Sequence, residues 1–180
     1  IGAAGFSSGG YTVLALAGAI YDPELMSAYC ASQERGKDCE LATDSSNVDF
    51  RDSSASYKDE RIKSVFSMAP AVGSAITKES LAEIELPVFI IASKDDELVS
   101  PNYGAIRYAE NIPRSDLVLL PSGGHFIFLE CNAIITVVDW LNRELDLCGT
   151  KFNVDRDEIR KMVSARAVSF FSDNLLAVTP

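Results

Sequence analysis

Gly5-Phe6-Ser7-Ser8-Gly9 is the stretch of sequence that decides the expected fold. It has the pattern G-x-S-x-G, and it lies between a short run of small and apolar residues, Ile1 to Ala4, and a run with helical character from Gly10 to Ile20. A strand, a sharp turn and a helix in this order are what a nucleophile elbow requires, because the turn presents the serine hydroxyl group beyond the end of a sheet. Glycines on both sides of the serine allow the strand and the helix to approach each other.

Ser7 also has a simpler interpretation, in which it is a serine in a glycine-rich turn or the N-cap of the helix that follows. The two interpretations differ in what the rest of the chain must contain. A nucleophilic serine needs an acid and then a histidine later in the sequence, each at the end of a strand.

Strand-like and helix-like segments alternate along the chain. Alternation of this kind predicts an α/β fold with a parallel sheet and helices on its faces. The expected strands are Ile1–Gly5, Arg61–Met68, Leu86–Ala92 and Leu117–Leu120, and the expected helices are Gly10–Ile20, Lys78–Ile84, Asn102–Asn111, Ala133–Leu147 and Val154–Ser172. We expect Asp22-Pro23 to stop the first helix and the apolar stripes of the last two helices to face the core.

The size and composition of the chain fit one catalytic domain over residues 1–180. It is 180 residues long and 47% hydrophobic, which is enough for a sizeable core. Polar residues dominate from about residue 29 to residue 57, and we predict a cap-like insertion there. The net charge of −10 disfavours binding to nucleic acid, and no apolar run reaches the length of an integral membrane segment.

The four cysteines form two local pairs, Cys30 with Cys39 and Cys131 with Cys148. An even, locally paired set favours disulfides and an extracytoplasmic location, periplasmic or secreted, although the sequence does not fix the connectivity. Unpaired buried thiols are the alternative. A metal site is disfavoured because the spacings are not C-x-x-C and the one histidine is needed elsewhere.

Three groups with complementary chemistry follow the expected strands. Ser7 follows the first strand, Asp95 and Asp96 follow the third, and His125 follows the fourth, after the loop Pro121 to Gly124. The carboxyl ends of parallel strands meet at one edge of a sheet, so we expect these side chains to lie together. A histidine can then take the serine proton, and a buried carboxylate can orient the imidazole. One of the two aspartates suffices, and we choose Asp96 as the orienting acid.

The chain resembles the C-terminal portion of an α/β-hydrolase of the predicted dienelactone hydrolase and platelet-activating-factor acetylhydrolase-like group. The resemblance rests on the segment from Gly5 to Tyr11, on Ser93-Lys94-Asp95-Asp96-Glu97-Leu98-Val99 after an apolar strand, and on Ser122-Gly123-Gly124-His125-Phe126. In that group the acid comes as G-x-x-D-x-x-V, which assigns it to Asp96, with Ser93 in place of the usual glycine. Cys131, Cys148 and Asp155-Arg156 also resemble extracytoplasmic members.

Two departures from the group bear on function. Dienelactone hydrolases proper carry cysteine where this chain has Ser7, so their substrate does not transfer. Such folds also contain strands before the elbow, which supply one oxyanion-hole N–H group. This chain therefore appears as a partial domain without the N-terminal strands, and the backbone N–H of Ser8 is the oxyanion donor that can be named.

The sequence predicts a serine esterase that cleaves a small-molecule carboxylic ester through Ser7, His125 and Asp96, with an acyl-enzyme and without cofactor or metal. Amide or peptide cleavage by the same triad is one alternative. A non-catalytic binding domain that has kept the fold is another. A further expectation is that the N-terminal part of the same fold is a missing partner of this chain.

Overall fold

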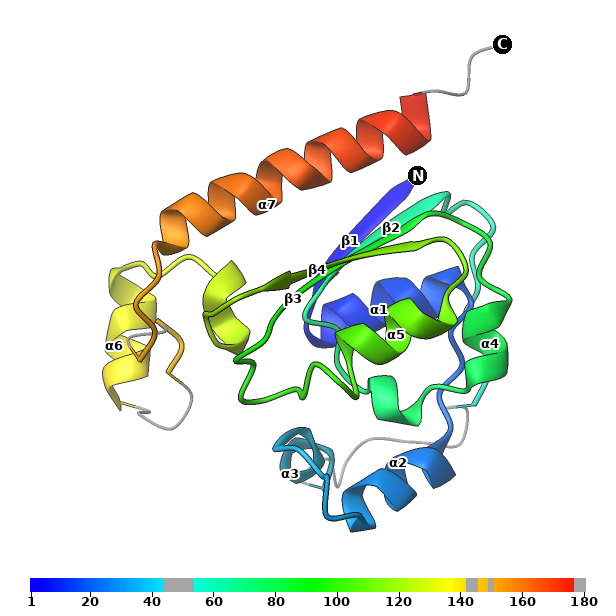
Figure 1. Cartoon of the computed structure of the whole chain (residues 1–180), viewed down its shortest axis with the longest axis horizontal. Helices are drawn as coiled ribbons and strands as arrows, with labels where there is room; N and C mark the ends of the chain where they lie inside the picture. The colour runs from blue at the N-terminus through cyan, green and yellow to red at the C-terminus, as the bar shows by residue number, and fades with distance from the viewer. Residues whose placement is uncertain (44–53, 142–145, 149–150, 177–180) are drawn as a thin grey trace.

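The computed structural model describes residues 1–43, 54–141, 146–148 and 151–176 (Figure 1). Four parallel strands lie side by side in chain order: β1 (Gly2–Phe6), β2 (Ser64–Met68), β3 (Val88–Ser93) and β4 (Ser115–Leu120). The expected α/β class, a parallel sheet flanked by helices, is confirmed. Phe6 pairs with Met68, and Ser93 pairs with Leu120, so the strands end along one edge.

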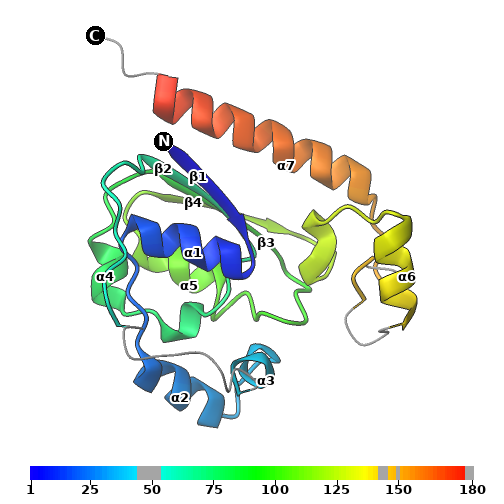
Figure 2. The same ribbon diagram turned by 180° about the vertical axis from the view of Figure 1, so that it is seen from behind.

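Helices cover both faces of the sheet (Figures 1 and 2). One face carries α1 (Ser8–Ala17), α4 (Lys78–Ala82) and α5 (Ala105–Asn111), and the other carries α7 (Arg156–Phe171). The remaining elements are α2 (Pro23–Ala31), α3 (Asp38–Thr43), α6 (Ala133–Leu141) and the short turns η1 (Gly73–Ala75), η2 (His125–Phe128) and η3 (Ser172–Leu176).

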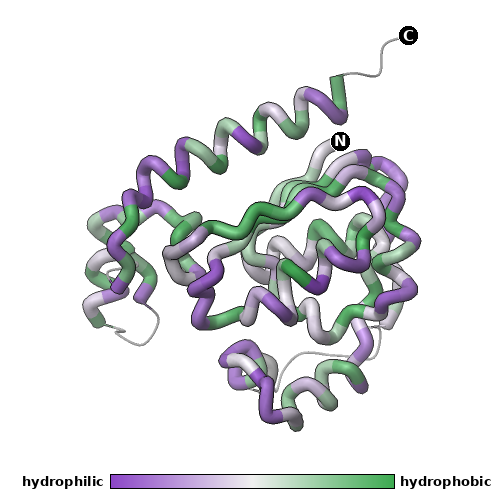
Figure 3. The backbone as a smooth tube through the Cα atoms, in the orientation of Figure 1, coloured by the Kyte–Doolittle hydropathy of each residue, from purple (hydrophilic) through white to green (hydrophobic). Residues whose placement is uncertain are grey.

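The apolar strand β3 separates the two halves of the core. All six of its residues are buried, as continuous apolar strands in parallel sheets usually are. Ile90 faces the cluster that also holds Leu14 of α1 and Tyr108 of α5, whereas Phe89 faces the cluster under α7. The tube coloured by hydropathy shows apolar stretches along the sheet, between α7 and the helices of the other face (Figure 3).

The first helix ends earlier than its sequence predicts. It stops at Ala17, because Gly18 adopts a φ of 124° and its N–H donates to the carbonyl oxygen of Ala15. This is a glycine C-cap. The expectation that Asp22-Pro23 stops this helix is wrong: Asp22 instead caps α2 by accepting from the N–H of Glu24, with Pro23 in the first turn.

The predicted polar insertion is described only in part, since residues 44–53 lie outside the described residues. Its described part contains the end of α2, the helix α3 and the disulfide between Cys30 and Cys39. The N–H of Asp38 donates to the carbonyl oxygen of Leu98 at 3.1 Å, so α3 contacts the loop after β3. The role of this insertion as a cap stays a prediction.

Helix α6 differs most from expectation. It ends at Leu141, Asp146 has a φ of 44°, and residues 142–145 lie outside the described residues. The prediction of a helix as far as Leu147 is therefore wrong at its end. Its apolar stripe does not face the core either, since Ile134 is 74% exposed and Leu141 is 71% exposed. In α7, by contrast, Val163 and Phe170 are buried.

The second predicted disulfide, between Cys131 and Cys148, is also present. Within the described ranges, every helix is too short or too polar to cross a membrane.

Candidate active site

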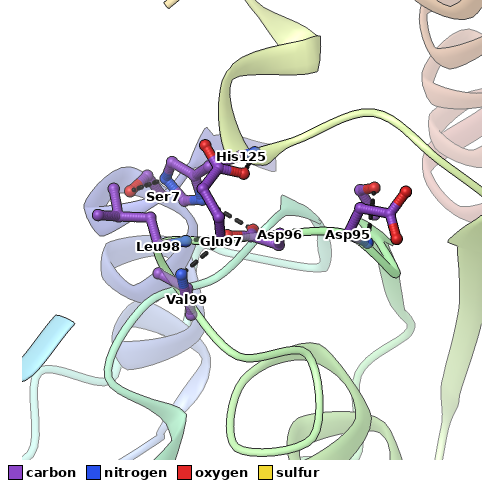
Figure 4. Close-up of polar contacts among 8 residues, drawn as sticks. Ser7, Asp95, Asp96, Glu97, Leu98, Val99 and His125 are labelled. Atoms are coloured by element: carbon purple, nitrogen blue, oxygen red, sulfur yellow. Dashed lines mark hydrogen bonds and ion pairs between the residues drawn. The ribbon is translucent and has the colours of Figure 1, made fainter. Parts of the chain in front are cut away.

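The predicted site residues come together at the carboxyl edge of the sheet (Figure 4). Ser7 lies between β1 and α1, Asp96 lies in the loop after β3, and His125 begins η2 after β4. The order of these three elements along the chain is the one expected from the sequence.

Ser7 occupies a strained turn. Its backbone has φ 56° and ψ −118°, a combination that is costly for a residue with a side chain. The turn is held by neighbours: the N–H of Ser7 donates to the carbonyl oxygen of Met68 at 2.9 Å, and its own carbonyl oxygen accepts from the N–H of Ala71 at 3.2 Å. The last residue of β2 and the loop after it thus fix the peptide groups on both sides of the serine.

Glycines allow this turn, although one of them is not the glycine expected. A β-carbon on Gly5 would overlap the carbonyl group of Gly9, so the strand and the helix touch there. A β-carbon on Gly9 itself would meet no atom within 4 Å. The second crowded position is Gly10, where a β-carbon would lie 2.9 Å from the Oγ of Ser67. The expectation that Gly9 must lack a side chain is therefore wrong.

The three polar side chains form one hydrogen-bonded chain. Nε2 of His125 lies 2.8 Å from the Oγ of Ser7, and its Nδ1 lies 2.8 Å from Oδ2 of Asp96. His125 has no exposed surface, and Asp96 is 8% exposed. These partners favour the tautomer with the proton on Nδ1, which leaves the lone pair of Nε2 facing the serine hydroxyl group. Although Ser7 occupies the N-cap position of α1, its side chain makes no capping bond.

Asp96 and Asp95 have different partners. Besides His125, Asp96 binds the N–H groups of Leu98 at 3.1 Å and Val99 at 2.8 Å through Oδ1. Asp95 instead accepts from the Oγ of Ser122 at 2.7 Å. Of the two candidate acids, the structure brings Asp96 against the histidine.

Aromatic rings cover the histidine. The ring centroid of Phe6 lies 5.0 Å from that of His125, and Phe126 and Phe128 lie 6.3 and 5.8 Å from Phe6. Phe6 belongs to the G-x-S-x-G stretch, but that motif leaves the residue before serine free, so the sequence carries no signal for this contact.

Glu97 is a second contact that sequence reasoning missed. Its Oε2 accepts from the backbone N–H of His125 at 3.1 Å. The only signal in the sequence is its position directly after Asp96. A further acid, Asp38, is 7% exposed, and burial raises its pKa, with the nearby charge of Asp96 as a smaller contribution.

Ser8 begins α1 and is exposed. The first N–H groups of a helix lack an intrahelical acceptor and favour negative charge, so the N–H of Ser8 is available to an oxyanion. Its role stays a prediction. Within the described ranges, no group of three His, Cys, Asp or Glu side chains is arranged to hold a metal ion.

Comparisons with known proteins give structural likeness alone. No protein-family model and no curated protein matches the chain. Similar solved structures include a predicted CIB-like hydrolase from Thermoplasma acidophilum, with 22% identity over 46% of this chain and 40% of that one and a TM-score of 0.34. Est1E from Butyrivibrio proteoclasticus is 12% identical over 94% of this chain and 60% of that one, with a TM-score of 0.43. A meta-cleavage product hydrolase from Pseudomonas fluorescens is 18% identical over 78% and 61%, with a TM-score of 0.35.

The chain thus spans 40%, 60% and 61% of the lengths of these three structures. At such identities and TM-scores the likeness carries nothing about activity. The function has to be inferred from the chain's own site.

Proposed function

We propose that this chain is the catalytic part of an α/β-hydrolase that cleaves carboxylic esters through an acyl-enzyme. The observation that carries the proposal is the hydrogen-bonded chain from the Oγ of Ser7 through His125 to Asp96, with the serine on a strained turn. Backbone strain is often found at functional residues. In a nucleophile elbow, the strained turn keeps the serine hydroxyl group exposed at the end of the sheet.

The contacts support a role for each of these groups. His125 takes the proton of the Ser7 hydroxyl group through Nε2 while Oγ bonds to the ester carbonyl carbon. Asp96 stabilises the resulting imidazolium through Nδ1, and the N–H of Ser8 binds the oxyanion. The imidazolium then gives its proton to the leaving alcohol. His125 then takes a proton from a water molecule whose oxygen bonds to the acyl carbon, and it returns this proton to the Oγ of Ser7 as the acyl–Oγ bond breaks and the acid leaves.

The wider assignment follows from the same site and from the disulfides. We place the chain within the dienelactone hydrolase and platelet-activating-factor acetylhydrolase-like group, because Asp96 stands at the position of the acid in that group's motif. The pairs Cys30–Cys39 and Cys131–Cys148 support an extracytoplasmic location, since disulfides persist in oxidising compartments. Strand β1 lies at the sheet edge, which supports a further part of the fold beside it.

A fluorophosphonate probe tests the proposal directly. It should label the folded wild-type protein at Ser7 and should not label Ser7→Ala. His125→Ala should react far more slowly, and Ser164→Ala, which changes an exposed serine on α7, should react like the wild type. A folded wild type that stays unlabelled, or equal labelling of Ser7→Ala, would contradict the assignment.

Substrate class is tested by comparing turnover of short nitrophenyl esters with that of peptide anilides. We expect the esters to be cleaved and the anilides to be cleaved at least about tenfold more slowly, because an amine is a poorer leaving group than nitrophenolate. Preferred cleavage of anilides would replace the ester assignment with the amide one.

A further inference from the structure

We propose that Asp95 and Glu97 are positioning residues that fix the loop carrying His125 on both sides of the orienting Asp96. This inference rests on the proposed function, because it assigns how the proposed base is held in place. Three consecutive acids would thus bind three different points of one loop.

Glu97 and Asp96 hold opposite parts of the same residue. Oε2 of Glu97 accepts from the backbone N–H of His125 at 3.1 Å, while Oδ2 of Asp96 lies 2.8 Å from the ring atom Nδ1. Figure 4 shows both acids reaching His125 from the loop after β3. With its backbone and its ring both fixed, the imidazole has little freedom to rotate away from Ser7.

Asp95 holds the start of the same loop. Its Oδ2 accepts from the Oγ of Ser122 at 2.7 Å. Between Ser122 and His125 lie only Gly123, with a φ of 116°, and Gly124. Glycines leave a backbone free to adopt many conformations, so a loop of this composition needs contacts at its ends.

Gly124 packs closely against Glu97 and Phe152. A β-carbon on Gly124 would lie 2.5 Å from Oε2 of Glu97 and 2.6 Å from the ring of Phe152. The carboxylate thus occupies the space that any side chain at residue 124 would need.

The acids themselves are presented by a fixed backbone. Oδ1 of Asp96 binds the N–H groups of Leu98 and Val99, and the N–H of Asp95 donates to the Oγ of Ser93, which is fully buried in β3. The N–H of Asp38 adds a contact to the carbonyl oxygen of Leu98. Because these hydrogen bonds fix the loop after β3, its acids can hold the loop that carries His125 in a defined position.

The consequence concerns the rate of proton transfer. A displacement of the base by about 1 Å can lower a rate about 100-fold. Loss of the Glu97 contact should therefore lower kcat and the rate of Ser7 labelling while leaving KM nearly unchanged. Gln can accept the same hydrogen bond through its amide oxygen, so Glu97→Gln should rescue the loss.

The experiment compares Glu97→Ala, Glu97→Gln and a control, Glu110→Ala, in the full chain. Glu110 is an exposed acid on α5. Second-order rate constants for fluorophosphonate labelling, and kcat and KM on a nitrophenyl ester, are measured for each. We expect Glu97→Ala to lose about 10- to 100-fold in kcat and in labelling, with KM within about twofold, and the other two variants to stay within about threefold of wild type.

Each other result overturns the inference. It fails if Glu97→Ala reacts like the wild type, if Glu97→Gln is as impaired as Glu97→Ala, or if KM rises while kcat is kept. Should Glu97→Ala not fold, Ser122→Ala decides in its place: labelling at least about threefold slower supports the inference, and a wild-type rate overturns it. A wild type that the probe does not label defeats the proposed function as well, whereas a labelled wild type with unaffected variants defeats this inference alone.

Discussion

The carbonyl group of Gly9 fills the space that a side chain on Gly5 would need. Strand β1 and helix α1 therefore meet at these two residues, on either side of Ser7. Only one of the pair requires glycine, because Gly9 has no atom within 4 Å of its own β-carbon position. Packing thus requires glycine at residue 5 of the motif but not at residue 9.

This asymmetry predicts opposite effects for the same substitution at the two positions. Gly5→Ala should destabilise the fold by at least about 3 kcal/mol, since overpacking against backbone has no flexible side chain to relieve it. Gly9→Ala, inside α1, should be neutral or should stabilise by up to about 1 kcal/mol, because alanine is the better helix former. Urea unfolding of both variants measures the difference. Equal destabilisation would show that Gly9 is also crowded.

Backbone strain at Ser7 gives a second prediction. Its φ of 56° is costly with any β-carbon present and easy for glycine. The free energy of unfolding should therefore be higher for Ser7→Gly than for Ser7→Ala, by about 1 kcal/mol or more, although both variants lose the nucleophile. Chemical denaturation compares the two variants, and a more stable Ser7→Ala would mean that the turn is not strained.

The sequence predicts the sheet and the three central side chains well, for physical reasons that can be named. Strand β3 is apolar without interruption, and such a strand must be buried on both faces. Chain order and the convergence of parallel strand ends then place Ser7, Asp96 and His125 at one edge. The chain has a single histidine, which leaves no competing choice for the base.

Features that depend on packing between distant segments could not be predicted. Asp22-Pro23 is the stop expected for α1 from the sequence, whereas the structure ends the helix at the Gly18 cap. Apolar spacing in α6 gives no sign that Ile134 faces solvent. The contact of Glu97 arises only when the loops after β3 and β4 meet, so no local pattern marks it.

Burial of Asp38 predicts a pH dependence of stability. Burial raises its pKa in the folded state, with the charge of Asp96 as a smaller contribution, so between the unfolded value of 3.8 and the folded value the native state binds more protons. The contribution of Asp38 to folding stability is therefore most favourable below its pKa in the unfolded state. It is lost as the pH rises through the pKa of Asp38 in the folded state. Asp38→Asn removes this titration. We expect it to raise Tm at pH 7 and to give a smaller gain at pH 4.

Asp59, a partly exposed aspartate, provides the control with the opposite sign. Hydrogen bonds from Arg61 lower the pKa of Asp59 to about 2, so its favourable contribution is present above the unfolded value of 3.8 and is lost as the pH falls toward 2. Asp59→Asn should thus lower Tm slightly at pH 7 and have a smaller effect near pH 2. Thermal unfolding across pH 2 to 7 tests both variants. A pH-independent difference for Asp38→Asn would contradict the raised pKa.

Arg156 and Arg160 lie one turn apart on α7 and should differ sharply in their contribution to stability. The guanidinium of Arg156 donates through Nη2 to the carbonyl oxygens of Phe126, Leu129 and Leu147, and burial lowers its pKa. Arg160 makes ion pairs with exposed acids at 3.3 and 3.4 Å, and such pairs contribute about 0–1 kcal/mol. Arg156→Met should cost about 2–4 kcal/mol, because partly buried carbonyl groups lose a charged donor, whereas Arg160→Met should cost less than about 1 kcal/mol. Since Phe126 follows His125 directly, Arg156→Met should also slow fluorophosphonate labelling of Ser7, and Arg160→Met should not. Equal unfolding free energies for the two variants would show that Arg156 does not hold the histidine segment.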